Sequence, residues 1–387
     1  VVIVACMMIS SRGAGAGWLA TAVMVVVAAD TTEFHWHFRP QAITYTCFAI
    51  LIAALDWIFR GWHGEWREMR TMLRGESLNP LPSALSRINW LLALVPLFWV
   101  WTNAHGGFAA GVAVLIAYLG LRITEAWCWW GRAAGGVIVR MGGVIVLVLL
   151  ATLLNPYGIE LHAWMLYDVL PARPEINDWR PLDMFGDRDA IGVWMLLVLG
   201  AIGLGFSRRR KDLTQLVILA LLLWQGLCDC RHLVFFAILC GCWLAPYVSD
   251  AIERVARDLR ETSQTLSQRR AAAKGSWLPT AVLVLWMLGV TATLVPRLTQ
   301  IPVRRDWYPV SAMEYVRDRG LTGRFLIDFN WAQYAIMCFA EDPRAAEASR
   351  VAVDGRLRTC YAWETLDIYL DFLMGNGGPD VRNRSPL

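Results

Sequence analysis

The sequence predicts an all-α polytopic transmembrane bundle of about nine spans, followed by a small α/β soluble domain at the carboxyl end. Three observations support this fold class. Of the 387 residues, 57% are hydrophobic and only 18% are charged, which is more apolar surface than a soluble fold can bury. The apolar residues form runs close to the ~20 residues that a membrane helix needs. After residue 297 the hydropathy drops, and 12 basic and 12 acidic residues fall in the final 91.

The transmembrane helical domain is predicted to cover residues 1–296. Several of its apolar runs are short, so buried or re-entrant segments are an alternative for them. The chain opens on VVIVACMMIS without Met, and we expect it to be part of a larger protein with further spans upstream. The nine spans are expected at 13–29, 41–59, 88–101, 107–121, 137–154, 190–206, 213–228, 233–248 and 277–296.

The loops between these spans differ in charge. One alternating set, which includes 60–87, 122–140 and 207–212, carries 19 Lys and Arg residues, whereas the other set carries five. The positive-inside rule makes the first set cytoplasmic and the second set outer. Five of the six histidines fall in the outer set, so we expect any chemistry on the outer side.

The carboxyl-terminal domain is predicted to cover residues 297–387. The order helix (311–319), strand (324–329), helix (331–340), strand (350–355) and helix (361–373) favours a small α/β unit with parallel strands. We expect this domain to be extracytoplasmic and incomplete, because the chain stops soon after the last helix.

A polar turn, WVWTNAHGGFAAG, separates two apolar runs on the outer side. Gly106 and Gly107 permit backbone geometry that other residues avoid, while Asn103 and His105 offer hydrogen bonds where a bare amide would be costly. His105 is therefore a candidate catalytic residue, and Asn103 a candidate substrate-binding residue. A turn capped by its own polar side chains is the alternative.

The longest outer loop contains LLNPYGIELHAW and EINDWRPLD. Asn155 and Tyr157 are candidate substrate contacts in its first part. Asp178, with Glu175 beside it, is the candidate catalytic base, since an outward carboxylate can accept a proton from a hydroxyl. Arg180 is a candidate substrate contact, and simple pairing with the nearby acids is the alternative.

Arginines also stand at predicted membrane entrances on the outer side. Arg39, and Arg231 with His232, could hold phosphate oxygens, because a guanidinium binds two of them at once. Snorkelling of arginine at a helix end is the alternative. In the carboxyl-terminal domain, Asp354 and Arg356 end a predicted strand, where α/β folds bind ligands, or lock a turn.

Cofactor motifs are absent from the sequence. We find no Walker loop, zincin helix, nucleophile elbow or dinucleotide fingerprint, which argues against an ATPase, a membrane metalloprotease or a nucleotide oxidoreductase. No cluster of residues requires a metal, so no cofactor is expected, and a divalent cation is not indicated. We also expect no nucleic-acid partner.

Taken in order, RPQ, WTNAHGGF, LNPYG, NDWRPL, RH and GRFLIDFNWAQYAIMCF followed by VAVDGR resemble a family of bacterial polytopic membrane proteins related to GT-C glycosyltransferases. The likeness spans residues 38 to about 370. The chain departs from the family pattern at Asp178, where Glu is usual, and at Ala332 and Gln333, which replace two glycines.

The resemblance implies a membrane glycosyltransferase that transfers a sugar from a polyprenyl-phosphate donor to an acceptor on the outer face. Membrane lipid, the polyprenyl-phosphate-linked sugar and an unidentified acceptor would be its partners, at the bacterial inner (plasma) membrane. GT-C enzymes generally carry a catalytic acid in the first outer loop, which we expect upstream of this chain. The alternatives are a lipid-glycan transporter or flippase, and a non-catalytic membrane protein of envelope assembly.

Overall fold

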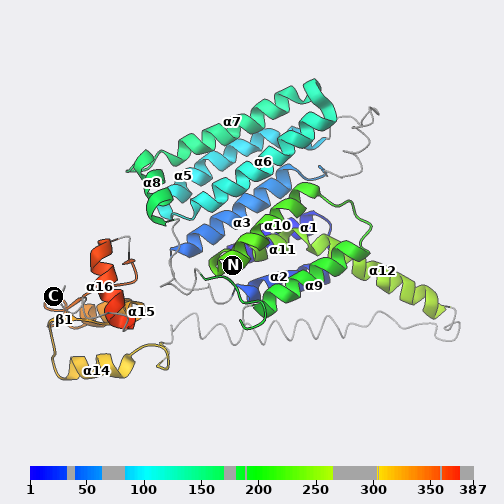
Figure 1. The fold of residues 1–387 in the computed structure, drawn as a ribbon. Helices are drawn as coiled ribbons and strands as arrows, with labels where there is room; N and C mark the ends of the chain where they lie inside the picture. The colour runs from blue at the N-terminus through cyan, green and yellow to red at the C-terminus, as the bar shows by residue number, and fades with distance from the viewer. Residues whose placement is uncertain are drawn as a thin grey trace. The chain divides into compact units, whose positions relative to one another are not determined.

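The computed structural model describes residues 1–32, 40–62, 83–169, 180–187, 190–264, 303, 305–357 and 360–374. The described part is mostly helical (Figure 1). The chain divides into two compact units, Val1–Gln268 and Arg269–Leu387, which we call the N-terminal and C-terminal units. The predicted span 277–296 and the predicted domain boundary after residue 296 lie outside the described residues.

The described part of the N-terminal unit is built from helices. They are α1 (Val2–Gly13), α2 (Trp18–Thr31), α3 (Gln41–Ile58), the 3-10 helix η2 (Ser83–Ala93), α5 (Leu94–Ala104), α6 (Phe108–Trp130), η3 (Gly131–Ala134), α7 (Gly135–Thr152), α8 (Ile159–Trp164), the single π turn η4 (Met165–Val169), α9 (Ala190–Phe206), α10 (Leu213–Cys228), η6 (Cys230–His232), α11 (Leu233–Trp243) and α12 (Ala245–Gln264).

Two described helical stretches are long and apolar enough to cross a membrane, Gln41–Ile58 and Phe108–Thr152. A third is reached if Cys230–Trp243 and Ala245–Arg257, which meet at a bend of 47°, form one broken span. The Phe108–Thr152 stretch has 45 residues, about 68 Å if it were straight, which is twice the thickness of a bilayer core. It bends at Gly131, whose φ is +50°, and α6 packs against α7 (Figure 1).

The apolar helices present apolar side chains both to the core and to the surroundings. On α9, Val193 and Leu196 are fully buried, whereas Ile191 and Phe206 are about 60% exposed. α7 shows the same division, with Met141 buried and Val139 exposed. A helix that is hydrophobic all round is suited to lipid rather than to water, so these faces indicate a membrane-embedded unit.

The connections of this unit gather at two ends. At one end, Arg209 donates from its guanidinium to the carbonyl oxygens of Ala14 (2.7 Å) and Gly15 (3.2 Å), and Ser207 bonds Asp250 at 2.8 Å. At the other end, Thr44 at the start of α3 meets the turn between α5 and α6, and Tyr45 packs on Phe235 of α11. We call these the Arg209 end and the His105 end.

The C-terminal unit has a core of Met313, Ala335, Phe339 and Ala345. Its helices are α14 (Val310–Asp318), α15 (Phe329–Glu341) and α16 (Trp363–Met374), and its strands are β1 (Arg324–Phe325) and β2 (Arg350–Val351). The strands pair in parallel, with Arg324 opposite Arg350. The order of elements is the one predicted, but each strand has two residues instead of six, because the chain turns at Asp328 to cap α15 and at Asp354.

Candidate functional site

The turn between α5 and α6 holds His105 in a defined position at the His105 end. Its Nδ1 lies 2.8 Å from Thr44 Oγ1 and accepts a hydrogen bond from the Gly107 N–H at 3.0 Å. The indole of Trp101 donates to the same Thr44 hydroxyl at 3.0 Å. Gly107 permits this approach, because a Cβ there would lie 2.4 Å from Thr44 Oγ1. The turn, α3 and α5 together therefore fix the imidazole.

Arg231 is near enough to this imidazole for its charge to act on the ring. Burial and the positive charge of Arg231 lower the pKa of His105 below its ordinary value. Arg231 belongs to η6, between α10 and α11, whereas His105 lies more than a hundred residues earlier. The structure thus brings together two predicted site residues, one a candidate catalytic residue and one a candidate phosphate contact.

His232 is anchored beside Arg231. Its ring stacks on Phe235 with centroids 6.0 Å apart, and its Nδ1 lies 3.3 Å from a carboxylate oxygen of Asp229 and from the amide of Gln225. Since Phe235 also contacts Tyr45 of α3, His232 belongs to the same end of the unit as His105. Its ring nitrogen is engaged within its own turn.

Asn103 and Asn155 tie neighbouring turns together. The Asn103 amide donates to the carbonyl oxygens of Trp99 (2.8 Å) and Leu154 (3.0 Å). Asn155 donates to the Gly158 carbonyl at 3.1 Å and accepts from the backbone N–H of Tyr157 at 2.8 Å. The Tyr157 side chain is exposed. The amide donors of both asparagines are thus used within turns, and for Asn103 a capped turn is the alternative that the sequence left open.

His162 is a residue of this end that the sequence reading did not single out. Its Nε2 lies 3.0 Å from the Thr152 hydroxyl, and Phe108 meets its ring edge to face at 5.6 Å. Its Nδ1 is buried and has no hydrogen-bond partner within the described residues. The only signal in the sequence was a histidine in a predicted outer loop.

Arg180 is engaged by a carboxylate. Its guanidinium makes two hydrogen bonds to Asp187, at 2.5 and 2.7 Å, which lower the pKa of that carboxyl. Its carbonyl accepts from the Cys230 N–H at 3.1 Å, so the segment after it runs beside η6. Arg180 is therefore next to the Arg231 turn and paired with an acid. Arg39, Glu175 and Asp178 lie outside the described residues.

A second polar cluster lies inside the unit, toward the Arg209 end. Arg122 of α6 is fully buried and bonds Asp212 at 2.5 Å, Glu125 at 2.8 Å and the Tyr118 hydroxyl at 3.1 Å. Glu125 also accepts from Thr214 at 2.6 Å. Arg122 stands 14 residues into α6, about 21 Å along the helix from Phe108. This Arg122 cluster is therefore separate from the His105 site.

In the C-terminal unit, Asp354 and Arg356 bond each other. Arg356 Nη2 donates to Asp354 at 2.7 Å, and the Arg356 N–H donates to the same carboxylate at 2.9 Å. Burial of Asp354 works against ionisation, but these bonds outweigh it and hold the pKa of the carboxyl below its ordinary value. The pair therefore locks the turn after β2, and the exposed guanidinium remains at the surface.

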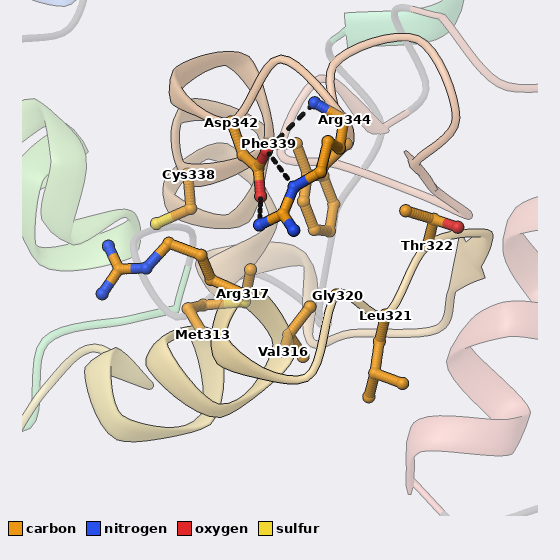
Figure 2. A pocket seen from close by; sticks show the side chains of 11 residues that line it. Met313, Val316, Arg317, Gly320, Leu321, Thr322, Cys338, Phe339, Asp342 and Arg344 are labelled. Carbon is orange, nitrogen blue, oxygen red and sulfur yellow. Dashed lines mark hydrogen bonds and ion pairs between the residues drawn. The ribbon is translucent and has the colours of Figure 1, made fainter.

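A small pocket lies between α14 and α15 of the same unit (Figure 2). Met313, Val316 and Phe339 form its apolar side, and Asp342 bonds Arg344 at its rim. Its volume of about 20 Å³ accommodates one water molecule. It is too small for a sugar.

Metal ligation finds no support in the described part of the chain. No group of three or more His, Cys, Asp or Glu residues there is arranged to hold an ion. The cysteines that are described are all free thiols, including Cys338 and Cys360.

No known protein family, curated protein or solved structure matches the chain.

Proposed function

We propose that the chain is a membrane glycosyltransferase-like protein of the GT-C type, which transfers a sugar from a polyprenyl-phosphate donor to an acceptor on the outer face. The observation that carries the proposal is the position of His105, bonded to Thr44 and Gly107 and close to Arg231, at one end of a bundle of apolar helices. A lipid-borne phosphate reaches a protein at the membrane boundary, where a guanidinium can neutralise it.

The distribution of basic residues supports the sidedness of this proposal. The alternating set of loops that includes Arg12, Arg60 and the 207–212 run carries 19 Lys and Arg residues against five in the other set, and Arg209 binds the turn after α1. The positive-inside rule then puts the Arg209 end in the cytoplasm and the His105 end outside. A bacterial inner membrane location, nine spans and an extracytoplasmic C-terminal unit complete the proposal.

The proposed reaction moves one sugar. The acceptor hydroxyl oxygen forms a bond to the anomeric carbon, and the bond from that carbon to the phosphate oxygen breaks. The polyprenyl phosphate leaves with the electron pair, stabilised by Arg231, and the hydroxyl proton passes to a carboxylate. Asp178 is proposed as that base, with Glu175 as its neighbour.

The test measures turnover in lipid. The protein is reconstituted in nanodiscs and given a panel of radiolabelled polyprenyl-phosphate sugars, and both transfer and hydrolysis are counted. We expect turnover that Arg231→Ala abolishes and that Arg140→Ala, at an exposed position of α7, leaves unchanged. If the wild-type protein shows a cooperative unfolding transition, and is therefore folded, but turns over no sugar in the panel, the proposal is contradicted.

A second function, a lipid-glycan transporter, is favoured by the Arg122 cluster. Ionisable residues buried within membrane helices mark ion or substrate pathways in many transporters, and Arg122, Glu125 and Asp212 are all buried here. The discriminating measurement is translocation of a fluorescent polyprenyl-phosphate lipid across vesicles. Translocation that Asp212→Asn abolishes in folded protein would favour the transporter over the transferase.

A further inference from the structure

The hydrogen bond between Trp101 and Thr44 has only one possible direction. An indole nitrogen carries a hydrogen and accepts nothing, so Trp101 donates and the Thr44 oxygen accepts, at 3.0 Å. The single hydroxyl hydrogen of Thr44 is then free to point at His105 Nδ1, 2.8 Å away. Trp101 is fully buried and Thr44 is 2% exposed, so water does not replace either group.

A backbone N–H also donates a hydrogen bond to Nδ1 of His105. The Gly107 N–H is also a pure donor, and it points at the same nitrogen from 3.0 Å. The Gly107 N–H requires the lone pair of Nδ1, so a hydrogen on that nitrogen is excluded and the Thr44 hydroxyl donates to it as well. A neutral imidazole in this position carries its hydrogen on Nε2.

The doubly protonated ring is disfavoured by the same contacts. It would set an N–H on Nδ1 against the Gly107 N–H, near the positive charge of Arg231. The lowered pKa of His105, caused first by burial and then by Arg231, agrees with a neutral ring. Within the described residues, Nε2 has no hydrogen-bond partner, and the side chain is partly exposed.

We infer that Thr44, Trp101 and Gly107 lock His105 as the neutral Nε2–H tautomer, and that this N–H together with Arg231 binds an anionic phosphate oxygen. His105 is then a ligand-binding donor and not a general base, which assigns proton transfer to a carboxylate. The identity of the phosphate as that of the lipid-linked sugar rests on the proposed function. The tautomer and the anion site do not depend on turnover.

The tautomer is measured by nuclear magnetic resonance on the whole protein with ¹⁵N-labelled histidine. The difference between wild type and His105→Asn assigns the His105 signals. We expect one ring nitrogen with the shift of a protonated nitrogen and a second with the shift of an unprotonated acceptor, the proton residing on Nε2. A proton on Nδ1, or a doubly protonated ring at neutral pH, would overturn the inference.

The donor role is measured by phosphate affinity with two matched substitutions. In His105→Asn the amide oxygen stands where Nδ1 was, so it still accepts from Thr44 and Gly107, but the outer donor is lost. In His105→Gln the longer amide can donate from the position of Nε2. Geranyl phosphate and inorganic phosphate are the two probes, in nanodiscs at constant salt, and they distinguish a lipid phosphate from a free one.

We expect geranyl phosphate to bind about tenfold or more weakly to His105→Asn, and within about threefold of wild type to His105→Gln. Equal affinity of wild type and His105→Asn, or no binding of either probe to the folded wild type, would overturn the inference. Tight binding with no sugar transfer would instead leave the anion site standing and remove the proposed transferase.

Discussion

The N-terminal unit contains two polar clusters of opposite character. In the Arg122 cluster, the charged groups satisfy one another, and Arg122, Glu125 and Asp212 are all buried. At the His105 end, Thr44 and Gly107 bond one nitrogen of the imidazole, the other nitrogen has no hydrogen-bond partner among the described residues, and the charge of Arg231 acts on the ring. A closed network of buried charges fixes how helices pack, whereas a fixed donor beside a cation can receive a ligand.

The largest expected effect is on stability, from Arg122→Met. The substitution leaves Asp212 and Glu125 as buried carboxylates without a cation, which costs about 3–5 kcal/mol of the free energy of unfolding. The free energy is measured by denaturant titration in detergent, followed by tryptophan fluorescence. The control is Arg140→Met, at an exposed position of α7, which should change it by less than about 0.5 kcal/mol. Equal effects would show that the Arg122 cluster does not support the packing.

A smaller effect is expected for Thr44→Val, which should cost about 1–3 kcal/mol. It leaves the buried Trp101 N–H without its acceptor and removes the hydroxyl that His105 Nδ1 needs. Thr46→Val in the same helix is the control, because among the described residues the Thr46 side chain bonds only the carbonyl of Ala42 one turn earlier. A stability loss confined to Thr44→Val would support the ordered turn, and no difference between the two variants would argue against it.

In the C-terminal unit we expect Asp354→Asn to lower stability by about 1 kcal/mol, since one acceptor remains and the charge is lost. The pKa of the Asp354 carboxyl is held below its ordinary value, so its contribution is present above about pH 4 and is lost as the pH falls through the folded pKa. Acid titration of the wild type and Asp354→Asn should therefore converge at low pH. Parallel curves would contradict the ion-pair account.

The smallest predicted effect is a pH dependence from His105. Its pKa is lowered in the folded state, so the unfolded state binds the proton more readily, and the free energy of unfolding falls as the pH falls below about 6.5. The other histidines contribute as well, so the measured quantity is the difference between wild type and His105→Asn across pH 5–8. That difference should shrink toward acid; a difference that grows would show that protonated His105 is favoured by folding.

Local sequence patterns predicted the apolar helices and the polar turn before α6, but not which residues bond across the fold. Gly106 and Gly107 indicated a tight turn beside His105, and counting loops put His105 and Arg231 on one side of the membrane. The Arg122–Asp212 ion pair was not predicted. Its two residues are 90 positions apart in the sequence, and each lies in, or at the edge of, a predicted cytoplasmic loop. The lengths of the strands in the C-terminal unit were overestimated, because an apolar run of sequence does not show that the chain turns at Asp328 or Asp354.

The difference between the two clusters also separates the candidate functions. A transferase needs a ligand only at the His105 end, whereas a transporter needs a path that continues toward Arg122. The most direct measurement uses a polyprenyl phosphate with a diazirine next to the phosphate, cross-linked in nanodiscs and mapped by mass spectrometry. We predict labelled peptides around residues 101–108 and 228–235, with labelling reduced by Arg231→Ala. Labelling centred on residues 118–125 and 212–215 instead would contradict the account.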